Sequence, residues 1–209
     1  IILTGNPIRQ DLLLPDAERI DSFRHFGLDP SRKVLLMIGG SGGARTLNES
    51  VMQHIGEIAA SGAQLIWQSG EYYYEAAMAL LKESGAANII LLPFIREMNR
   101  AFQVADVIIT RAGAGTISEL CVIGKPAILV PSPNVAEDHQ TRNARSLTDE
   151  HAGILVHDQD AVEELMAKAL QLLDDEQEKA LLSKNIKKRA LPDASDRIAG
   201  EVIKILKRT

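Results

Sequence analysis

Cysteine is nearly absent from this sequence of 209 residues, which contains only Cys121. A lone cysteine cannot form an internal disulfide, and it excludes a zinc site built from cysteines. The apolar residues around Cys121 predict a reduced and buried thiol. Long apolar runs are absent as well, because none approaches the ~20 residues that a helix needs to cross a bilayer. Residues 1–5 lack the charged region that opens a signal peptide.

Basic residues do not predominate. The chain has 23 Lys and Arg against 28 Asp and Glu, which gives a formal net charge of −5. Nucleic-acid-binding proteins carry a basic footprint, so we expect no nucleic-acid partner. The negative net charge also does not favour binding of this segment to anionic lipid. With 45% hydrophobic and 24% charged residues, the chain has the composition of an ordinary folded protein.

Several signatures of enzymes are missing. No G-x-G-x-x-G occurs, and the second predicted strand closes on Gln68, Ser69 and Gly70 without an acidic residue, so NAD is disfavoured. The P-loop of ATPases is absent too. We expect no metal site and no cofactor, because most of the histidines are scattered without metal-ligand spacing. These are His25, His54, His151 and His157.

The sequence does contain an alternation of short apolar runs with longer segments of helical periodicity. Strands that alternate with helices predict right-handed βαβ crossovers and a mostly parallel sheet covered on both faces. About six strands in this arrangement make a doubly wound, Rossmann-like α/β domain. The predicted strands are residues 34–38, 64–68, 88–92, 106–110, 127–130 and 153–156.

We expect residues 1–209 to form one nucleotide-binding domain with three parts. Residues 1–33 would be an interdomain strand, linker and first helix, residues 34–190 the Rossmann-like core, and residues 191–209 a C-terminal helix. Because the chain does not begin with Met and opens on what reads as the end of a strand, we expect a piece of a longer protein. One side of the last helix is apolar and should lie against another surface. Its residues are Ile198, Val202, Ile205 and Leu206.

The first candidate site is the loop between the first predicted strand and its helix. Its residues are Gly39, Gly40, Ser41, Gly42, Gly43 and Ala44. Glycines let the backbone approach an anion closely, and the following helix directs free N–H groups and a positive dipole at it. A tight turn with positive φ is the alternative interpretation. Four glycines in residues 39–43 exceed what a turn requires, so we interpret the loop as a phosphate site.

A second glycine-containing loop follows the fourth predicted strand. Its residues are Thr110, Arg111, Ala112, Gly113, Ala114, Gly115 and Thr116. Both loops fall at the carboxyl ends of strands, where open α/β sheets bind ligands, so together they can enclose a pyrophosphate. Glu119 has two interpretations at this stage. Its carboxylate suits a vicinal diol such as a ribose, or it completes a capping box with Thr116 at a helix start.

A third loop, residues 131–140, follows the fifth predicted strand. Two prolines make it rigid, and His139 and Gln140 offer neutral hydrogen-bonding groups suited to sugar hydroxyls. The alternative is a rigid loop with Asp138 as a helix cap, and His139 alone is more often structural than catalytic. The acidic residues beside later helix starts are expected to be N-caps. They are Asp158, Asp160, Asp174 and Asp175.

These motifs occur together in a characteristic order. They comprise residues 4–9, residues 39–45 with Leu47 and Asn48, residues 111–119, residues 124–131, and residues 138–140 with Asn143 and Ala144. The set resembles the C-terminal half of the MurG family, the bacterial lipid-I N-acetylglucosaminyltransferases of peptidoglycan synthesis. The resemblance covers nearly the whole chain.

The resemblance implies a GT-B glycosyltransferase, in which two Rossmann-like domains face each other across a cleft. In such enzymes the C-terminal domain holds the nucleotide sugar, here UDP-N-acetylglucosamine. Carried over to this sequence, Ser41 and the adjoining glycine amides would hold the pyrophosphate. The backbone at Phe94 and Ile95 would read the uracil edge.

Further donor contacts follow from the same resemblance. Glu119 would accept hydrogen bonds from the ribose hydroxyls, and His139 and Gln140 would meet the sugar or the phosphates. Arg9 would also face the donor. Many relatives carry a larger residue such as Gln where this chain has Gly42, so one side-chain contact with the pyrophosphate is missing here.

The implied reaction is a single inverting displacement. A sugar hydroxyl of lipid I attacks the anomeric carbon, UDP leaves, and helix N-termini stabilise the charge on the β-phosphate without a metal. The general base and the lipid I site are attributed to an N-terminal domain, which is absent here, so this chain alone should bind donor and turn over little or nothing. The parent would act peripherally at the cytoplasmic face of the bacterial plasma membrane.

Other interpretations stay open. Another UDP-sugar enzyme of the same fold, such as a UDP-GlcNAc 2-epimerase, would need no lipid acceptor. In isolation the chain is also compatible with a catalytically silent nucleotide-sugar-binding module.

Overall fold

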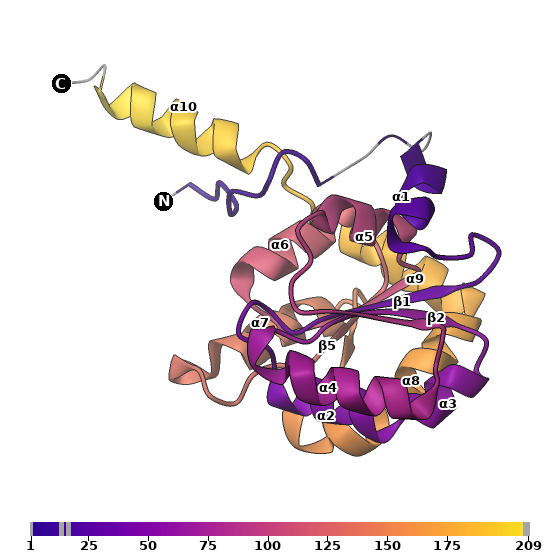
Figure 1. Ribbon diagram of the computed structural model, residues 1–209. Helices are drawn as coiled ribbons and strands as arrows, with labels where there is room; N and C mark the ends of the chain where they lie inside the picture. The colour runs from indigo at the N-terminus through magenta and orange to yellow at the C-terminus, as the bar shows by residue number, and fades with distance from the viewer. Residues whose placement is uncertain (1, 13–14, 16–17, 207–209) are drawn as a thin grey trace.

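Six short apolar segments form one sheet in the computed structural model, which describes residues 2–12, 15 and 18–206 (Figure 1). Most of their side chains are buried, as expected for parallel strands covered on both faces. The strands are β1 (Val34–Ile38), β2 (Gln64–Gln68), β3 (Ile89–Leu92), β4 (Val107–Thr110), β5 (Ala127–Leu129) and β6 (Ile154–Leu155). All six predicted strands are present, and the last four are one or two residues shorter than predicted.

The strand order is β3-β2-β1-β4-β5-β6, and every neighbouring pair is parallel. The chain therefore moves outward from β1 to β3, returns to the other side of β1, and moves outward again. The loops after β1 and β4 lead in opposite directions, and in open α/β sheets such a switch point creates a crevice at the carboxyl ends of the two strands. The predicted Rossmann-like α/β fold is confirmed.

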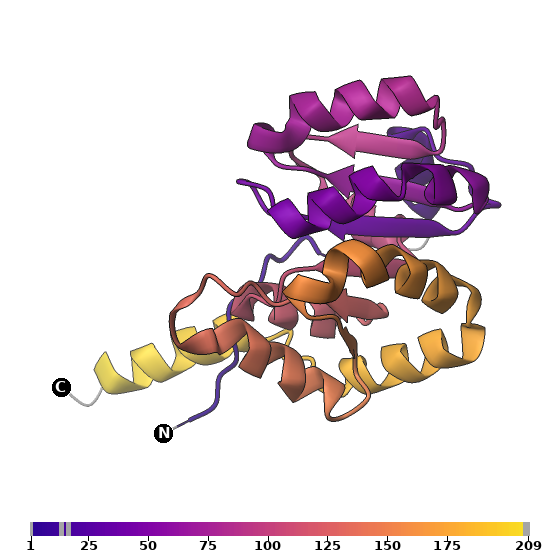
Figure 2. The ribbon, with the colours of Figure 1, turned by 90° about the horizontal axis from the view of Figure 1, so that it is seen from below.

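Helices cover both faces of the sheet, as Figure 1 and the view from below in Figure 2 show. Leu35 and Met37 of β1 point into one core, whereas Val34 and Leu36 point into the other. The first core is covered by α2 (Arg45–Gln53), α3 (Ile55–Ala60), α4 (Glu71–Ser84) and α8 (Ala161–Asp174). The second is covered by α1 (Arg19–Phe26), α5 (Met98–Val104), α6 (Ala114–Ile123) and α7 (His139–Thr148).

Helix α9 (Glu176–Lys187) contributes Leu182 to one core and Ile186 to the other. Its N-terminus is capped as predicted, because Asp175 accepts a hydrogen bond from the backbone N–H of Glu178 at 2.9 Å. The same prediction is wrong for Asp174, which ends α8 and pairs with Lys33. That hydrogen bond lowers the pKa of the Asp174 carboxyl.

Cys121 lies in the second core, and burial raises the pKa of its thiol, in agreement with the predicted buried side chain. No helix in the described part of the chain is long and apolar enough to cross a membrane.

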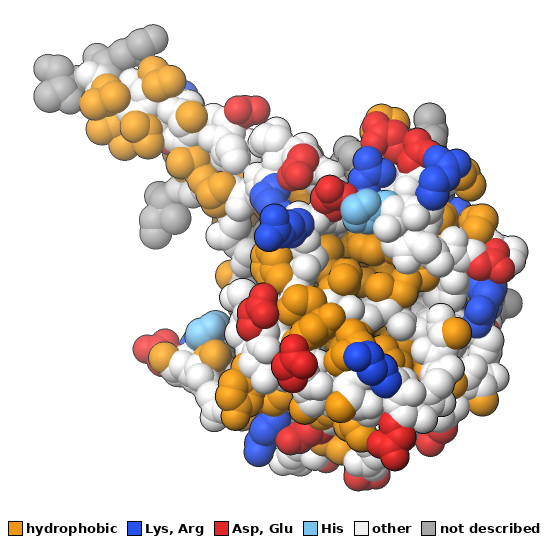
Figure 3. All heavy atoms as spheres, viewed as in Figure 1, with side chains coloured by type: hydrophobic (Ala, Val, Ile, Leu, Met, Phe, Trp, Pro, Cys, Tyr) orange, Lys and Arg blue, Asp and Glu red, His pale blue; other side chains and the backbone are white. Residues whose placement is uncertain are grey.

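Helix α10 (Ala194–Leu206) projects from the body beside the N-terminal segment, and both ends lie on one side of the molecule (Figures 1 and 2). Its apolar residues gather along one face in Figure 3. Val202, Ile205 and Leu206 are each at least half exposed, so the described residues do not cover this face. The contact predicted for it stays a prediction.

Candidate nucleotide-sugar site

Two backbone segments are in direct contact beside the crevice. The loop after β1 and the turn after β2 touch through Gly43 and Gly70, which both have φ of +80°. A Cβ at Gly43 would lie 2.3 Å from the carbonyl oxygen of Ser69, and a Cβ at Gly70 would lie 2.2 Å from the nitrogen of Gly43. Only glycine fits such contacts. Gly39 is also confined, because its Cβ would lie 2.9 Å from the carbonyl oxygen of Gln68.

This contact changes the interpretation of the glycine run. Gly39 and Gly43 are required by packing, and Gly40 by its φ of +79°. Gly42 faces open space, and its φ lies outside the left-handed region. The number of glycines therefore argues less strongly for a ligand than the sequence suggested. The exposed middle of the loop, at Gly40, Ser41 and Gly42, is the part that is accessible to a phosphate.

A buried polar network holds this loop from below. The indole N–H of Trp67 donates to Oδ1 of Asn48 at 2.8 Å, and Nδ2 of Asn48 donates to the carbonyl of Ser69 at 2.9 Å. All three residues are fully buried. Asn48 lies in α2, which begins directly after the loop at Arg45. The network thus fixes the N-terminus of α2 against the turn after β2.

The predicted capping box at Thr116 is wrong. Helix α6 begins at Ala114, with Gly113 in an extended conformation as its N-cap and without a side-chain cap. Thr116 and Glu119 therefore lie inside the helix, where a capping box cannot form. The first turn contains Ala114, Gly115 and Thr116, whose N–H groups precede the first intrahelical hydrogen bonds and are free to bind an anion.

Glu119 instead pairs with the N-terminal segment. Nε of Arg9 lies 3.3 Å from Oε1 of Glu119, whose side chain is 22% exposed. Asn6 supports this placement by donating to the hydroxyl of Ser118 at 2.9 Å. The structure therefore brings together two of the predicted donor contacts, Arg9 and Glu119, although they are 110 positions apart in the sequence.

The backbone after β3 is also held in place. The N–H of Ile95 donates to Oε1 of Gln68 at 3.0 Å, and both residues are buried. This N–H is therefore already used. The hydrogen bonds found among the described residues leave the carbonyls of Phe94 and Ile95 without a backbone partner. Phe94 itself is 49% exposed and offers an aromatic face beside these carbonyls.

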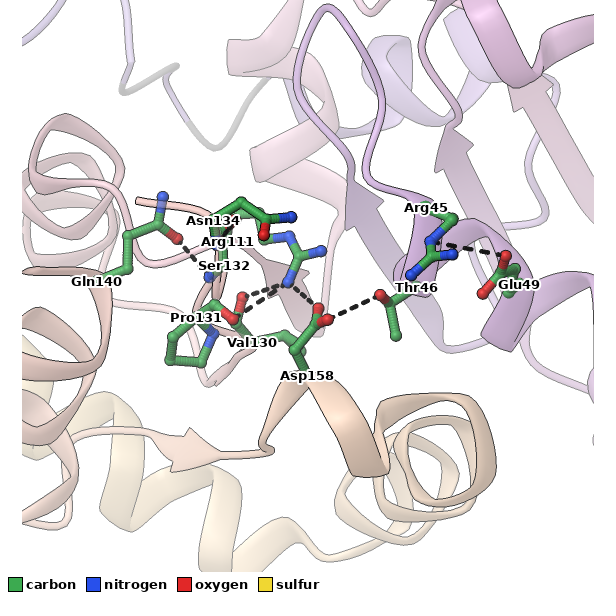
Figure 4. Close-up of polar contacts among 10 residues, drawn as sticks. All are labelled: Arg45, Thr46, Glu49, Arg111, Val130, Pro131, Ser132, Asn134, Gln140 and Asp158. Carbon is green, nitrogen blue, oxygen red and sulfur yellow. Dashed lines mark hydrogen bonds and ion pairs between the residues drawn. The ribbon is translucent and has the colours of Figure 1, made fainter. Parts of the chain in front are cut away.

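The third loop is organised around the start of α7. Oε1 of Gln140 accepts from the N–H of Ser132 at 2.9 Å (Figure 4), which leaves the amide NH₂ of Gln140 as a donor. Nδ1 of His139 lies 2.8 Å from the carbonyl of Ala136. Asp138 precedes the helix as predicted, but its carboxylate accepts from the hydroxyl of Thr141 at 2.6 Å instead of from a backbone N–H.

Arg111 is held by its own chain. Its NH1 group donates to the carbonyls of Val130 and Pro131, at 3.1 and 3.2 Å, and to the carboxylate of Asp158 (Figure 4). The N-cap role predicted for Asp158 is wrong, because this residue begins η3 (Asp158–Asp160) and pairs with Arg111. No local signal could have revealed this pair, which joins loops 47 positions apart.

The arrangement favours an anionic ligand with a diol. The exposed glycine loop and the N-termini of α2 and α6 present N–H groups at the crevice, Glu119 offers a carboxylate, and His139 and Gln140 lie at the start of α7. Within the described ranges no cluster of three or more His, Cys, Asp or Glu side chains is placed to hold a metal.

A doubly wound parallel sheet with glycine loops at its switch point defines the C-terminal, Rossmann-like domain of a GT-B glycosyltransferase. Comparison with known families specifies it further. The chain belongs to the family described as the glycosyltransferase family 28 C-terminal domain, whose model matches residues 34–198.

Known proteins agree with this assignment. A relative from Phocaeicola vulgatus, named UDP-N-acetylglucosamine–N-acetylmuramyl-(pentapeptide) pyrophosphoryl-undecaprenol N-acetylglucosamine transferase, is 48% identical over 98% of this chain and 55% of its own length. The crystal structure of Acinetobacter baumannii MurG matches with a TM-score of 0.73 and 30% identity, over 89% of this chain and 53% of that one. The resemblance to the MurG family is confirmed, and the chain spans about half the length of these relatives.

A more distant structure matches in fold alone. A putative UDP-N-acetylglucosamine 2-epimerase from Listeria monocytogenes has a TM-score of 0.61 at 16% identity, and the match covers 99% of this chain and 54% of that one.

The contact at Gly43 generates a stability test. We expect Gly43→Ala to lower the free energy of unfolding by more than about 1 kcal/mol, because the new Cβ meets Ser69 and the φ is strained. Gly42→Ala has neither obstacle and should raise it by about 0.4–1 kcal/mol. Urea denaturation of both variants measures the difference. Equal midpoints would show that the two backbones do not pack as described.

Proposed function

We propose that this chain is the donor-binding half of an inverting glycosyltransferase, which transfers N-acetylglucosamine from UDP-N-acetylglucosamine to lipid I to make lipid II. The family, and the names of relatives at 41–48% identity, support this activity. The observation that carries it is the topology of the sheet, in which the glycine loop after β1 and the start of α6 after β4 follow neighbouring strands at the switch point, with Glu119 on α6.

The nucleotide fits the groups that the crevice leaves available. The pyrophosphate lies against the exposed glycine loop, where Ser41 adds a hydroxyl. The N–H of Ile95 is already bonded to Gln68 and is not available to uracil. Uracil is therefore recognised through the carbonyls at Phe94 and Ile95, which accept from its N3–H. Glu119 accepts from the ribose diol. Because Arg9 pairs with that carboxylate, it lies close enough to contact the same ligand.

The sugar lies toward the third loop. The free NH₂ of Gln140 donates to a sugar hydroxyl or a phosphate oxygen, and His139 lies at the same helix start. Arg111 contributes to this site as a bridge between loops, because its guanidinium is bonded to Asp158 and to two carbonyls.

The chain's own part in the reaction is to hold the leaving group. As the acceptor hydroxyl attacks the anomeric carbon from the face opposite UDP, negative charge grows on the β-phosphate. The N–H groups and positive ends of α2 and α6 stabilise this charge without reorganisation. The general base and the lipid I site belong to the part of the relatives that this chain does not span. The whole enzyme works peripherally at the cytoplasmic face of the plasma membrane.

Epimerisation of UDP-N-acetylglucosamine is the second candidate. The likeness to an epimerase is confined to the fold, at 16% identity, whereas the transferase relatives reach 48%. Incubating the donor alone with the chain and searching for a 2-epimer separates the two.

Ligand binding should raise thermal stability. At a hundredfold excess over Kd, a ligand of the folded state contributes about 2.7 kcal/mol. We expect UDP and UDP-N-acetylglucosamine to raise the melting temperature, whereas NAD should leave it unchanged because the acidic residue that binds its ribose is missing after β2. Differential scanning fluorimetry provides the measurement. An absent shift at millimolar UDP contradicts the proposal.

Glu119 provides the sharpest test of the site. A hydrogen bond to a charged group is worth about 1.5–3 kcal/mol, so Glu119→Gln should weaken UDP binding roughly ten- to a hundredfold. The melting temperature without ligand should barely move, since the pair with Arg9 is partly exposed and no cap is lost.

Glu164→Gln is the matched control, because it breaks an exposed pair with Lys168 on α8 and should leave UDP affinity unchanged. Calorimetric titration compares the three proteins. Parental affinity in Glu119→Gln would exclude the ribose role of Glu119.

We expect no transfer of N-acetylglucosamine to a lipid I analogue by this chain alone, because the base and the acceptor site lie outside it. Radiolabelled donor and chromatography of the lipid product provide the assay. Sustained turnover would place a general base within these residues, and His139 would be the first to substitute.

A further inference from the structure

Asp158 connects two sides of the crevice, and both of its carboxylate oxygens are used. Oδ1 accepts from NH1 of Arg111, and Oδ2 accepts from the hydroxyl of Thr46 at 3.0 Å (Figure 4). Its side chain is only 17% exposed. Asp158 does not occupy the N-cap position of α8, which falls on Asp160.

The Arg111 side of this connection leads to the third loop. The same NH1 that binds Asp158 also donates to the carbonyls of Val130 and Pro131, which directly follow β5. The next residue, Ser132, is held by the side chain of Gln140. The carboxylate thus compensates the charge of a mostly buried guanidinium that fixes the start of the loop.

The Thr46 side leads to the glycine loop. Thr46 is the second residue of α2 and is 6% exposed. Its hydrogen bond to Asp158 fixes the first turn of the helix whose N-terminus follows the exposed residues at positions 40–42. The network of Trp67 and Asn48 holds the opposite side of this helix against the turn after β2.

We propose that Asp158 is a positioning residue for the pyrophosphate part of the donor. It touches no ligand itself. It keeps the first turn of α2 and the loop after β5 at a fixed separation, so that the N–H groups of α2 and the amide NH₂ of Gln140, which is bonded to Ser132 in that loop, converge on the β-phosphate. This inference rests on the proposed function, because it names a residue that tunes the same site.

The position of the two hydrogen bonds of Asp158 predicts which part of the ligand depends on them. Uracil and ribose lie against Phe94, Ile95 and Glu119, which are outside the network of Asp158. Loss of this carboxylate should therefore weaken contacts with the β-phosphate and spare those with the nucleoside. The ratio of the Kd values for UMP and UDP measures the contribution of the β-phosphate contacts. A general loss of stability does not change this ratio.

The experiment measures Kd for UDP and UMP by competition titration on folded protein, checked by circular dichroism. We expect Asp158→Ala to weaken UDP binding about tenfold, the equivalent of one lost hydrogen bond to a charged group, and UMP binding less than about twofold. Thr46→Val removes only the hydrogen bond to α2 and keeps the pair of Asp158 with Arg111, so it should reduce the UDP preference less, by about threefold.

Asp106→Ala is the matched control at the opposite edge of the sheet. It removes a carboxylate that accepts from the backbone N–H of Val34 at 2.8 Å, so it should destabilise the fold and leave the preference for UDP over UMP unchanged.

Two failures are distinguishable. A parental chain that binds no UDP refutes the proposed function itself. The role of Asp158 is overturned if the unsubstituted chain binds UDP and the Asp158→Ala variant keeps or increases the preference for UDP over UMP. If Asp158→Ala does not fold, Thr46→Val decides by the same criterion, because its side chain has nearly the same shape as that of the parent.

Discussion

All six strands run in the same direction, and this constraint determines where everything else can be. Each strand must be followed by a crossover that returns the chain to the other end of the sheet, so every carboxyl end and every following loop lies on one edge. In the order β3-β2-β1-β4-β5-β6, the loops after β1 and β4 lead in opposite directions. The crevice is therefore a product of topology, and the residues of the loops only decide what it holds.

In the proposed complex, the crevice recognises charge mainly through the backbone. The cations that the structure brings to it are already compensated, Arg9 by Glu119 and Arg111 by Asp158. What remains for an anion is a set of N–H groups at the starts of α2 and α6, together with the exposed part of the glycine loop. Such dipoles are fixed by the fold and do not need to reorganise when charge moves to the leaving group. This suits a reaction that ends with charge on a diphosphate.

Local signals predicted what is local in the structure. Strands β1 and β2 match their predicted ranges because buried parallel strands are continuous apolar runs with polar residues or glycine at their ends. The helix start at Ala114 was misplaced, since Gly113 supplies an extended N-cap that has no side-chain signal. The links of Asp158 to Arg111 and Thr46 were not predictable. They join residues 47 and 112 positions apart, and only the fold brings them together.

The burial of Trp67 has a spectroscopic consequence. It is the only tryptophan of the chain, it has no exposed surface, and its indole N–H is bonded to Asn48 beneath the glycine loop. Its fluorescence therefore comes from a single apolar environment and should have a blue-shifted emission maximum. Because that one hydrogen bond connects the indole to α2, the emission is an intrinsic optical probe of the sheet edge that carries the glycine loop, free from background of other indoles.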